Sequence, residues 1–437
     1  MTATPAVLGP IDTARALSVL APLVAQGAIV RRPAVTAWAE RHQVDRRGAA
    51  TLAGLRRRTG GGPAVVRLPG LSLAVLLDPE HVVRVLDETP SPFRADSREK
   101  RAALHKFQPE AVLVTEPAGR APKRAANVTA LQPGRPQHEL GAVFDAAVDR
   151  AVDRMATRAL AVGRLEWEPF TQAFDSAVRE VVLGPGAVDD VDLTTRLTDL
   201  RAAANWAFLL PDRPVEREEF TAHLRSRVEA APADASLAGF FGARTDGDAT
   251  GQVPHWLFAF DAAGAAVFRA LAVAAARPDL TAELAAEAHL PAPERLVARG
   301  SVLESVRLWP TTLVVLRESD SATTWGDGEL PAGTAVVIVS SFFHRDSGRV
   351  PFAHSFSPQV WNDGRAEADR ALIPFSTGPA GCPGRDVVAA VAGRFLARSV
   401  AELRLSSPRS VHLAQDPLPW TVDHSGLTFA AERRNAA

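Results

Sequence analysis

The only cysteine among the 437 residues, Cys382, lies in a stretch rich in glycine and proline. Gly378, Gly381 and Gly384 surround it, and an apolar run that is typical of a helix begins at Val387. A thiol placed just before a helix N-terminus has unpaired backbone N–H groups and the positive end of the helix dipole beside it, and both favour the thiolate. A single thiolate in an open, glycine-lined loop can serve as the one sulfur ligand of a haem iron.

The alternative interpretation of Cys382 is a small buried hydrophobe, since a free cysteine is usually inert core. On Cys382 alone the two interpretations are about equally supported. The flanking glycines favour a ligand, because a core cysteine has no need of an open loop. Phe375, which precedes the glycines, can pack beneath a flat group bound above the loop.

The spacing Phe-x-x-Gly-x-x-x-Cys-x-Gly over 375–384 resembles the cysteine-ligand loop of the cytochrome P-450 superfamily. The resemblance implies a mainly α fold with a small β-rich part in a single domain. It also implies haem b (iron protoporphyrin IX), with Cys382 as metal ligand and catalytic residue and with Phe375 and Gly384 beside the haem. One departure is Ala380, which stands where the family usually has a basic residue.

A second motif, Glu304-Ser305-Val306-Arg307, places a carboxylate and a guanidinium on one face of a predicted helix. The Glu-x-x-Arg spacing is common by itself, but upstream of Cys382 it resembles the family's helix that braces the haem loop. Relatives join this structural pair to a basic residue in a Phe-x-Pro-x-Arg-Phe segment. Here that position is Val360, so we expect the third partner to be missing or replaced by Arg365.

Three arginines match family positions that bind the haem propionates. Arg317 follows the Glu-x-x-Arg helix, and Arg120 and Arg124 fall where relatives carry a His-x-x-x-Arg pair. Arginine suits this task because its planar fork binds a carboxylate through two hydrogen bonds and keeps its charge. The alternative for these arginines is a solvated basic helix face.

Residues 255–271 form a long apolar stretch that resembles the family's central helix, although a plain core helix has the same pattern. If Ala263 and Gly264 occupy the positions that lie against the haem, Ala266 and Val267 replace the acid and threonine that deliver protons in relatives, and Asp261 lies elsewhere on the helix. Protons then come from the substrate or ordered water, peroxide replaces dioxygen, or the chemistry is not ordinary oxygenation. The predicted substrate pocket is Phe260, Ala263, Val267, Thr311, Thr312 and Leu313.

Composition narrows the class of protein. The hydrophobic content of 46% fits a soluble chain with a large core, and a formal net charge of −1 gives no reason to expect a nucleic-acid partner. A single cysteine excludes an internal disulfide and fits a reducing compartment, so we expect a cytoplasmic location. The uncharged stretch 16–30 is too short and too interrupted for a transmembrane anchor, and favours an amphipathic helix on the body or at a membrane surface.

The predicted elements follow the same outline. Residues 36–58 are helical, 64–77 form a β-hairpin around a Pro-Gly turn, and 89–110 are a loop. Helices dominate from about 137 to 300, and a β-rich section covers 311–339. We divide the chain into a helical extension over 1–49 and a haem domain over 50–437.

Three functions remain open. The first is a monooxygenase that uses dioxygen and electrons from a separate ferredoxin or flavodoxin system, since no redox domain is fused, to oxidise a small apolar, secondary-metabolite or lipid-like substrate. The second is a peroxygenase or another oxygen-independent haem-thiolate enzyme, suggested by Ala266 and Val267. The third is a non-catalytic protein that binds haem or a hydrophobic ligand.

Overall fold

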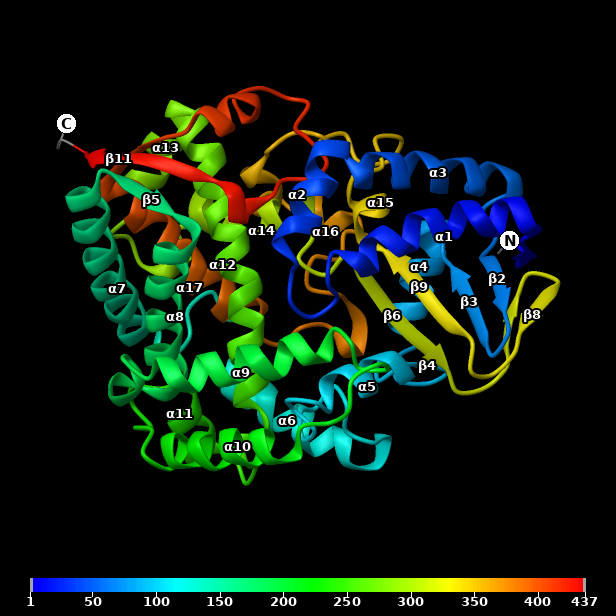
Figure 1. Cartoon of the computed structure of the whole chain (residues 1–437), viewed down its shortest axis with the longest axis horizontal. Helices are drawn as coiled ribbons and strands as arrows, with labels where there is room; N and C mark the ends of the chain where they lie inside the picture. The colour runs from blue at the N-terminus through cyan, green and yellow to red at the C-terminus, as the bar shows by residue number, and fades with distance from the viewer. Residues whose placement is uncertain (1–2, 435–437) are drawn as a thin grey trace.

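A computed structural model describes residues 3–434 and divides into a large helical part and a smaller β-rich part (Figure 1). The helices are α1 (Pro10–Ala25), α2 (Pro33–His42), α3 (Val44–Thr59), α4 (Pro79–Asp87), α5 (Arg98–Leu104), α6 (Pro117–Leu131), α7 (Gly141–Val162), α8 (Trp167–Leu183), α9 (Val191–Ala204), α10 (Pro214–Glu229), α11 (Leu237–Arg244), α12 (Val253–Ala276), α13 (Pro278–Ala286), α14 (Leu296–Leu308), α15 (Ser340–His344), α16 (Arg365–Ala368) and α17 (Arg385–Glu402). The strands are β1 (Ala6–Val7), β2 (Ala64–Leu68), β3 (Leu71–Val75), β4 (Phe93–Arg94), β5 (Arg164–Glu166), β6 (Val314–Ser319), β7 (Thr323–Trp325), β8 (Gly328–Leu330), β9 (Ala335–Val339), β10 (Leu403–Ser406) and β11 (Thr428–Arg433). This is the cytochrome P450 type of architecture that the resemblance implies.

Six strands form the main sheet in the order β1-β2-β3-β9-β6-β4. The predicted hairpin is present as β2 and β3, with Leu68 paired to Leu71 across a turn in which Gly70 has a φ of +73°. β9 lies parallel to β3 and antiparallel to β6. The sheet therefore joins the N-terminal third of the chain to the β-rich section after α14.

Helix α12 runs through the middle of the helical part and packs against α8, α14 and α17 (Figure 1). It contains no serine or threonine, and most of its side chains are buried. By length and composition it is the one helix in residues 3–434 that could cross a membrane, but 78% of its most apolar window is buried inside the protein. It is therefore the core helix of the fold.

One prediction about the N-terminal third needs correction and another stays a prediction. Helix α3 runs without interruption through residue 49 and β1 adds a strand to the main sheet, so the division into 1–49 and 50–437 stays a prediction. Residues 89–110 are not only loop, because they contain β4 and α5. Ser97 caps α5 by accepting from the N–H of Lys100, a short-range signal that proline-rich surroundings concealed.

Candidate active site

The loop that carries Cys382 is held by its own backbone. The N–H of Cys382 donates to the carbonyl oxygen of Phe375 at 2.9 Å, and the N–H of Gly381 donates to that of Gly378 at 2.9 Å. Gly378 has a φ of +68°, and a Cβ there would lie 2.3 Å from the carbonyl oxygen of Leu86 at the end of α4. No other residue type fits this position, so the loop is seated on α4 through a glycine.

The thiol of Cys382 lies three residues before α17, as the sequence predicts. The N–H groups of Gly384 and Arg385 and the positive charge of Arg124 favour the thiolate, but burial has the larger effect and raises the pKa above its ordinary value. The expected lowering is therefore wrong for the protein alone. Cys382 is half-buried, so part of its surface stays accessible to a bound group.

Two of the predicted arginines contact this loop. Arg124 donates to the carbonyl oxygen of Gly381 at 2.7 Å, and Arg317 donates to the Ser376 hydroxyl at 3.3 Å. Arg317 is 2% exposed and has no carboxylate within ion-pair distance among residues 3–434, so burial lowers its pKa to about 10. Arg120 is half-buried, contributes to that lowering, and makes no hydrogen bond within the same residues.

Lys100 completes this cluster and was not predicted. Its ammonium donates to the carbonyl oxygens of Ala95 at 3.0 Å and of Leu316 at 2.9 Å, and Arg317 donates to the same Leu316 oxygen. Burial and the charges of Arg317 and Arg120 hold the pKa of Lys100 well below its usual range. The only signal in the sequence that could have pointed to Lys100 is that lysine is rare in this chain, which has three.

Glu304 and Arg307 form a fully buried ion pair, with both side chains at 0% exposure. The Arg307 guanidinium donates to both Glu304 oxygens, at 2.8 and 2.6 Å, and to the main-chain oxygens of four residues between 344 and 355. A buried ion pair is tolerated only when its remaining hydrogen-bonding capacity is satisfied. This pair meets that condition by fixing the segment that leads to the cysteine loop.

The third partner of the pair is Trp361, which was not predicted. Its indole N–H donates to Glu304 Oε2 at 2.9 Å, while the N–H of Ser357 donates to Oε1 at 3.0 Å. Arg365, the expected substitute, pairs instead with Asp363 at 2.6 Å on the surface. The indole lies next to Val360 and supplies a donor without adding a charge to the buried carboxylate.

Residues 295–419 match the family model described as Cytochrome P450. These residues include both the Glu304–Arg307 pair and the Cys382 loop. Residues 295–419 of the chain are therefore similar to the cytochrome P450 superfamily, the family that the sequence motifs also resemble.

The chain is also similar to several curated cytochrome P450 proteins. It is 30% identical over 135 residues to cyclooctat-9-en-7-ol 5-monooxygenase of Streptomyces melanosporofaciens, covering 29% of each chain. It is 30% identical over 120 residues to cytochrome P450 709B3 of Arabidopsis thaliana, covering 26% of this chain and 23% of the relative. The matches thus span less than a third of these relatives.

The family implies a haem cofactor, and the residues present fit one. A haem brings one iron that accepts a thiolate and two propionates that need cations. Here one half-buried thiol lies in the glycine-rich loop, and Lys100, Arg120 and Arg317 lie near that loop without a carboxylate in contact. The family usually has a basic residue at the position of Ala380. If Lys100 binds a haem propionate in its place, this accounts for the missing side chain and for the presence of three cations that repel one another.

The predicted α12 residues lie within the packing of the fold. A Cβ on Gly264 would lie 3.2 Å from the ring of Phe174, so Gly264 serves the packing of α12 on α8. Phe260 and Val267, four residues before and three after Gly264, share that face and are buried. Ala266 faces α14, since its carbonyl oxygen accepts from the Ser305 hydroxyl at 2.8 Å.

Seven α12 residues retain partial exposure: His255, Phe258, Ala259, Asp261, Ala262, Ala275 and Ala276. Asp261 forms an ion pair with Arg201 of α9. Phe260, Ala263 and Val267 are buried in the packing of α12, and their role in a substrate pocket stays a prediction. Of the other predicted pocket residues, Thr311 and Leu313 are half-buried and Thr312 is exposed, and their role stays a prediction.

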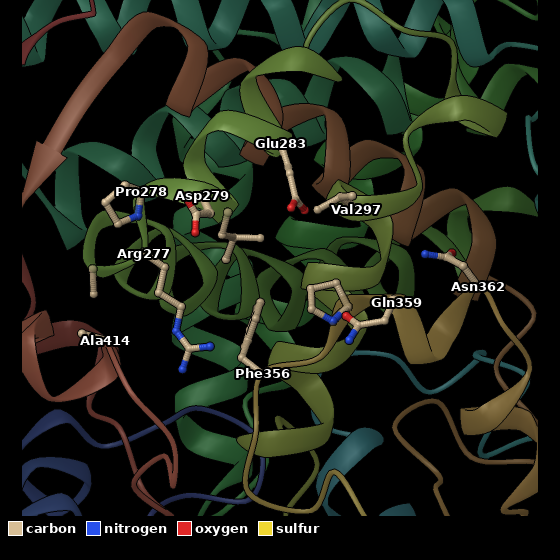
Figure 2. A pocket seen from close by; sticks show the side chains of 12 residues that line it. Arg277, Pro278, Asp279, Glu283, Val297, Phe356, Gln359, Asn362 and Ala414 are labelled. Atoms are coloured by element: carbon tan, nitrogen blue, oxygen red, sulfur yellow. The ribbon is translucent and has the colours of Figure 1, made fainter.

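A surface cavity of about 460 Å³ lies away from this site, where the ends of α12 and α14 meet α13 (Figure 2). Phe356 points into it from the segment that Arg307 holds, and Arg277, Asp279 and Glu283 surround its rim. None of the predicted site residues lines it. We therefore assign it no part in the reaction.

Proposed function

We propose that the protein is a haem-thiolate monooxygenase that binds haem b through Cys382 and oxidises a largely apolar substrate. The observation that carries the proposal is the convergence of one half-buried thiol with Lys100, Arg120 and Arg317, none of which contacts a carboxylate. When bound, the haem supplies the redox chemistry that activates oxygen, with the thiolate favouring O–O cleavage.

The chain's own residues position and shield this chemistry. The N–H groups of Gly384 and Arg385 and the charge of Arg124 stabilise negative charge on the thiolate sulfur. Arg317 and Lys100, fixed through the shared Leu316 carbonyl, would hold carboxylates without rearranging. The Glu304–Arg307–Trp361 network fixes residues 344–361, which precede the cysteine loop in the chain.

We further propose that electrons come from a separate ferredoxin or flavodoxin system and that the protein works in the cytoplasm. The support for the first is the family, and for the second the single cysteine. The name of the Streptomyces relative, a monooxygenase, supports the reaction class only.

The test is the difference spectrum of the reduced protein with carbon monoxide, for the wild type and Cys382→Ser. We expect a red-shifted, thiolate-type Soret band in the wild type and its loss in the variant at unchanged protein yield. Absence of bound haem, or a band that the substitution leaves in place, would overturn the assignment of Cys382.

One observation favours a second candidate, a peroxygenase. α12 contains no hydroxyl side chain, and its one carboxylate, Asp261, is engaged by Arg201. The side chains that relatives use to deliver protons are therefore missing or occupied. Product formation with hydrogen peroxide but not with dioxygen, reductase and ferredoxin would select the peroxygenase. Product formation only with dioxygen, reductase and ferredoxin would select the monooxygenase. No product with either oxidant would select a non-catalytic haem protein.

A further inference from the structure

The segment between α1 and α2, residues 27–32, crosses the helical part as a strap. Asn205, which follows α9, accepts from the N–H groups of Ile29 at 2.9 Å and Val30 at 3.3 Å and donates to the Val30 carbonyl oxygen at 2.8 Å. Arg32 lies over the Trp206 ring at 4.3 Å from its centroid. The strap is thus fixed to the end of α9.

Both ends of the strap are also anchored. On one side, β1 pairs with β2 and leads into α1. On the other, the side chain of Gln43 accepts from the N–H of Trp420 at 2.7 Å, and Asp45 accepts from the Thr421 hydroxyl at 2.6 Å. A side chain carried by this segment therefore has a defined position.

That side chain is Arg31, whose guanidinium points inward. It donates to the carbonyl oxygen of Gly27 at 2.7 Å and to that of Thr311 at 2.5 Å. Thr311 begins the stretch that leads to Arg317 at the cysteine loop, and six residues of chain span at most about 20 Å. Arg31 is therefore in direct contact with Thr311, one of the predicted pocket residues.

The Arg31 side chain is only partly buried. Burial lowers its pKa to about 10, with only a long-range contribution from Asp45, yet the residue retains partial exposure. Part of the Arg31 side chain therefore stays accessible to a bound molecule.

No carboxylate of residues 3–434 forms an ion pair with Arg31. Its two hydrogen bonds use two of five N–H donors, so three remain for a ligand. A planar guanidinium with free donors in a partly desolvated wall matches a carboxylate, which it can bind through two parallel bonds. A purely apolar substrate would leave these donors unused, with the charge attracted by Asp45 but hydrogen-bonded to no carboxylate in that part of the chain.

From this geometry we propose that Arg31 is a substrate-recognition residue, and that the preferred substrate is an apolar molecule that ends in a carboxylate. This rests on the proposed function of the site and narrows its substrate class. Asn205 acts as a positioning residue, because it fixes the strap that presents Arg31.

The test compares two probes of equal length, a saturated fatty acid and the corresponding primary alcohol, over chains of about eight to sixteen carbons. Binding to the haem-loaded protein is titrated through the Soret shift. We expect the wild type to bind the acid at least about tenfold more tightly than the alcohol. Arg31→Gln should remove that preference by weakening the acid alone, and Arg31→Lys should keep part of it.

Arg41→Gln is the matched control, since Arg41 is an exposed arginine of α2 that makes no side-chain hydrogen bond within residues 3–434, and it should leave both affinities unchanged. A merely structural Arg31 would weaken acid and alcohol equally in Arg31→Gln. That result, equal binding of the two probes by the wild type, or no binding of any acid in the series, overturns the proposal. Loss of the thiolate-type carbon monoxide band in the wild type would instead overturn the proposed function.

Discussion

The indole N–H of Trp361 is predicted to stabilise the buried Glu304 carboxylate, and Trp361→Phe isolates that bond. Oε2 of Glu304 then keeps only the donation from Arg307 Nε at 2.8 Å, in a site at 0% exposure. A hydrogen bond to a charged group contributes about 1.5–3 kcal/mol, so we expect the free energy of unfolding to fall by about 2 kcal/mol plus the cost of the smaller ring.

The assay is denaturant unfolding of the haem-loaded protein, with Trp309→Phe as the matched control. Trp309 is similarly buried, but its indole N–H donates to the neutral carbonyl oxygen of Pro419 at 3.0 Å, a bond that contributes about 1 kcal/mol. Both variants lose the same ring volume, so their difference reports the charge on Glu304. Arg365→Ala should change stability by less than about 0.5 kcal/mol because Arg365 pairs on the surface.

Two results would refute this reasoning. If Trp361→Phe destabilises no more than Trp309→Phe, the indole does not support the carboxylate as a charged acceptor. If Arg365→Ala destabilises as much as Trp361→Phe, the third partner of the pair is the arginine, as the sequence suggested.

Three more predictions concern the same site. Gly378→Ala should lower the melting temperature and haem content far more than Gly134→Ala, because both have positive φ but only Gly378 lacks room for a Cβ. Lys100→Met should stabilise the haem-free protein, by relieving repulsion with Arg317, yet speed haem loss to an acceptor globin; slower or unchanged loss would contradict a propionate contact. Burial lowers the pKa of His344 to about 3, so its neutral form contributes its full stabilisation above pH 6.5. The free energy of unfolding should therefore fall by about 2 kcal/mol between pH 6.5 and 5. Urea midpoints measured over this pH range should fall less steeply in His344→Gln.

Sequence predicted the parts of the site that depend on short-range spacing. The Cys382 loop, the helix after it and the Glu304–Arg307 face are each defined within a dozen residues, and the structure has all three. The hairpin at β2 and β3 was predictable for the same reason, since a Pro-Gly turn fixes its register.

What sequence missed depends on contacts between distant segments. Trp361 replaces a charged partner with a neutral donor, and pattern matching by residue type cannot find a substitution that preserves only the N–H. Lys100 joins the basic cluster because Ser97 starts a short helix that turns it toward Leu316. The open face of α12 could not be read from a helix that is apolar all round, because its orientation is set by α8 through Phe174.

The electrostatics of the site follow from the same distant contacts. The protein alone holds a thiol whose pKa burial raises and gathers Lys100, Arg120 and Arg317 without a carboxylate in contact. Each of these features lowers the stability of the haem-free chain, since charges are buried without a carboxylate partner. A ligand that supplies two carboxylates for the cations and a metal ion for the thiolate removes all of these unfavourable contributions together. Haem binding should therefore contribute a large part of the stability of the fold, because a ligand that binds only the native state shifts the folding equilibrium toward it.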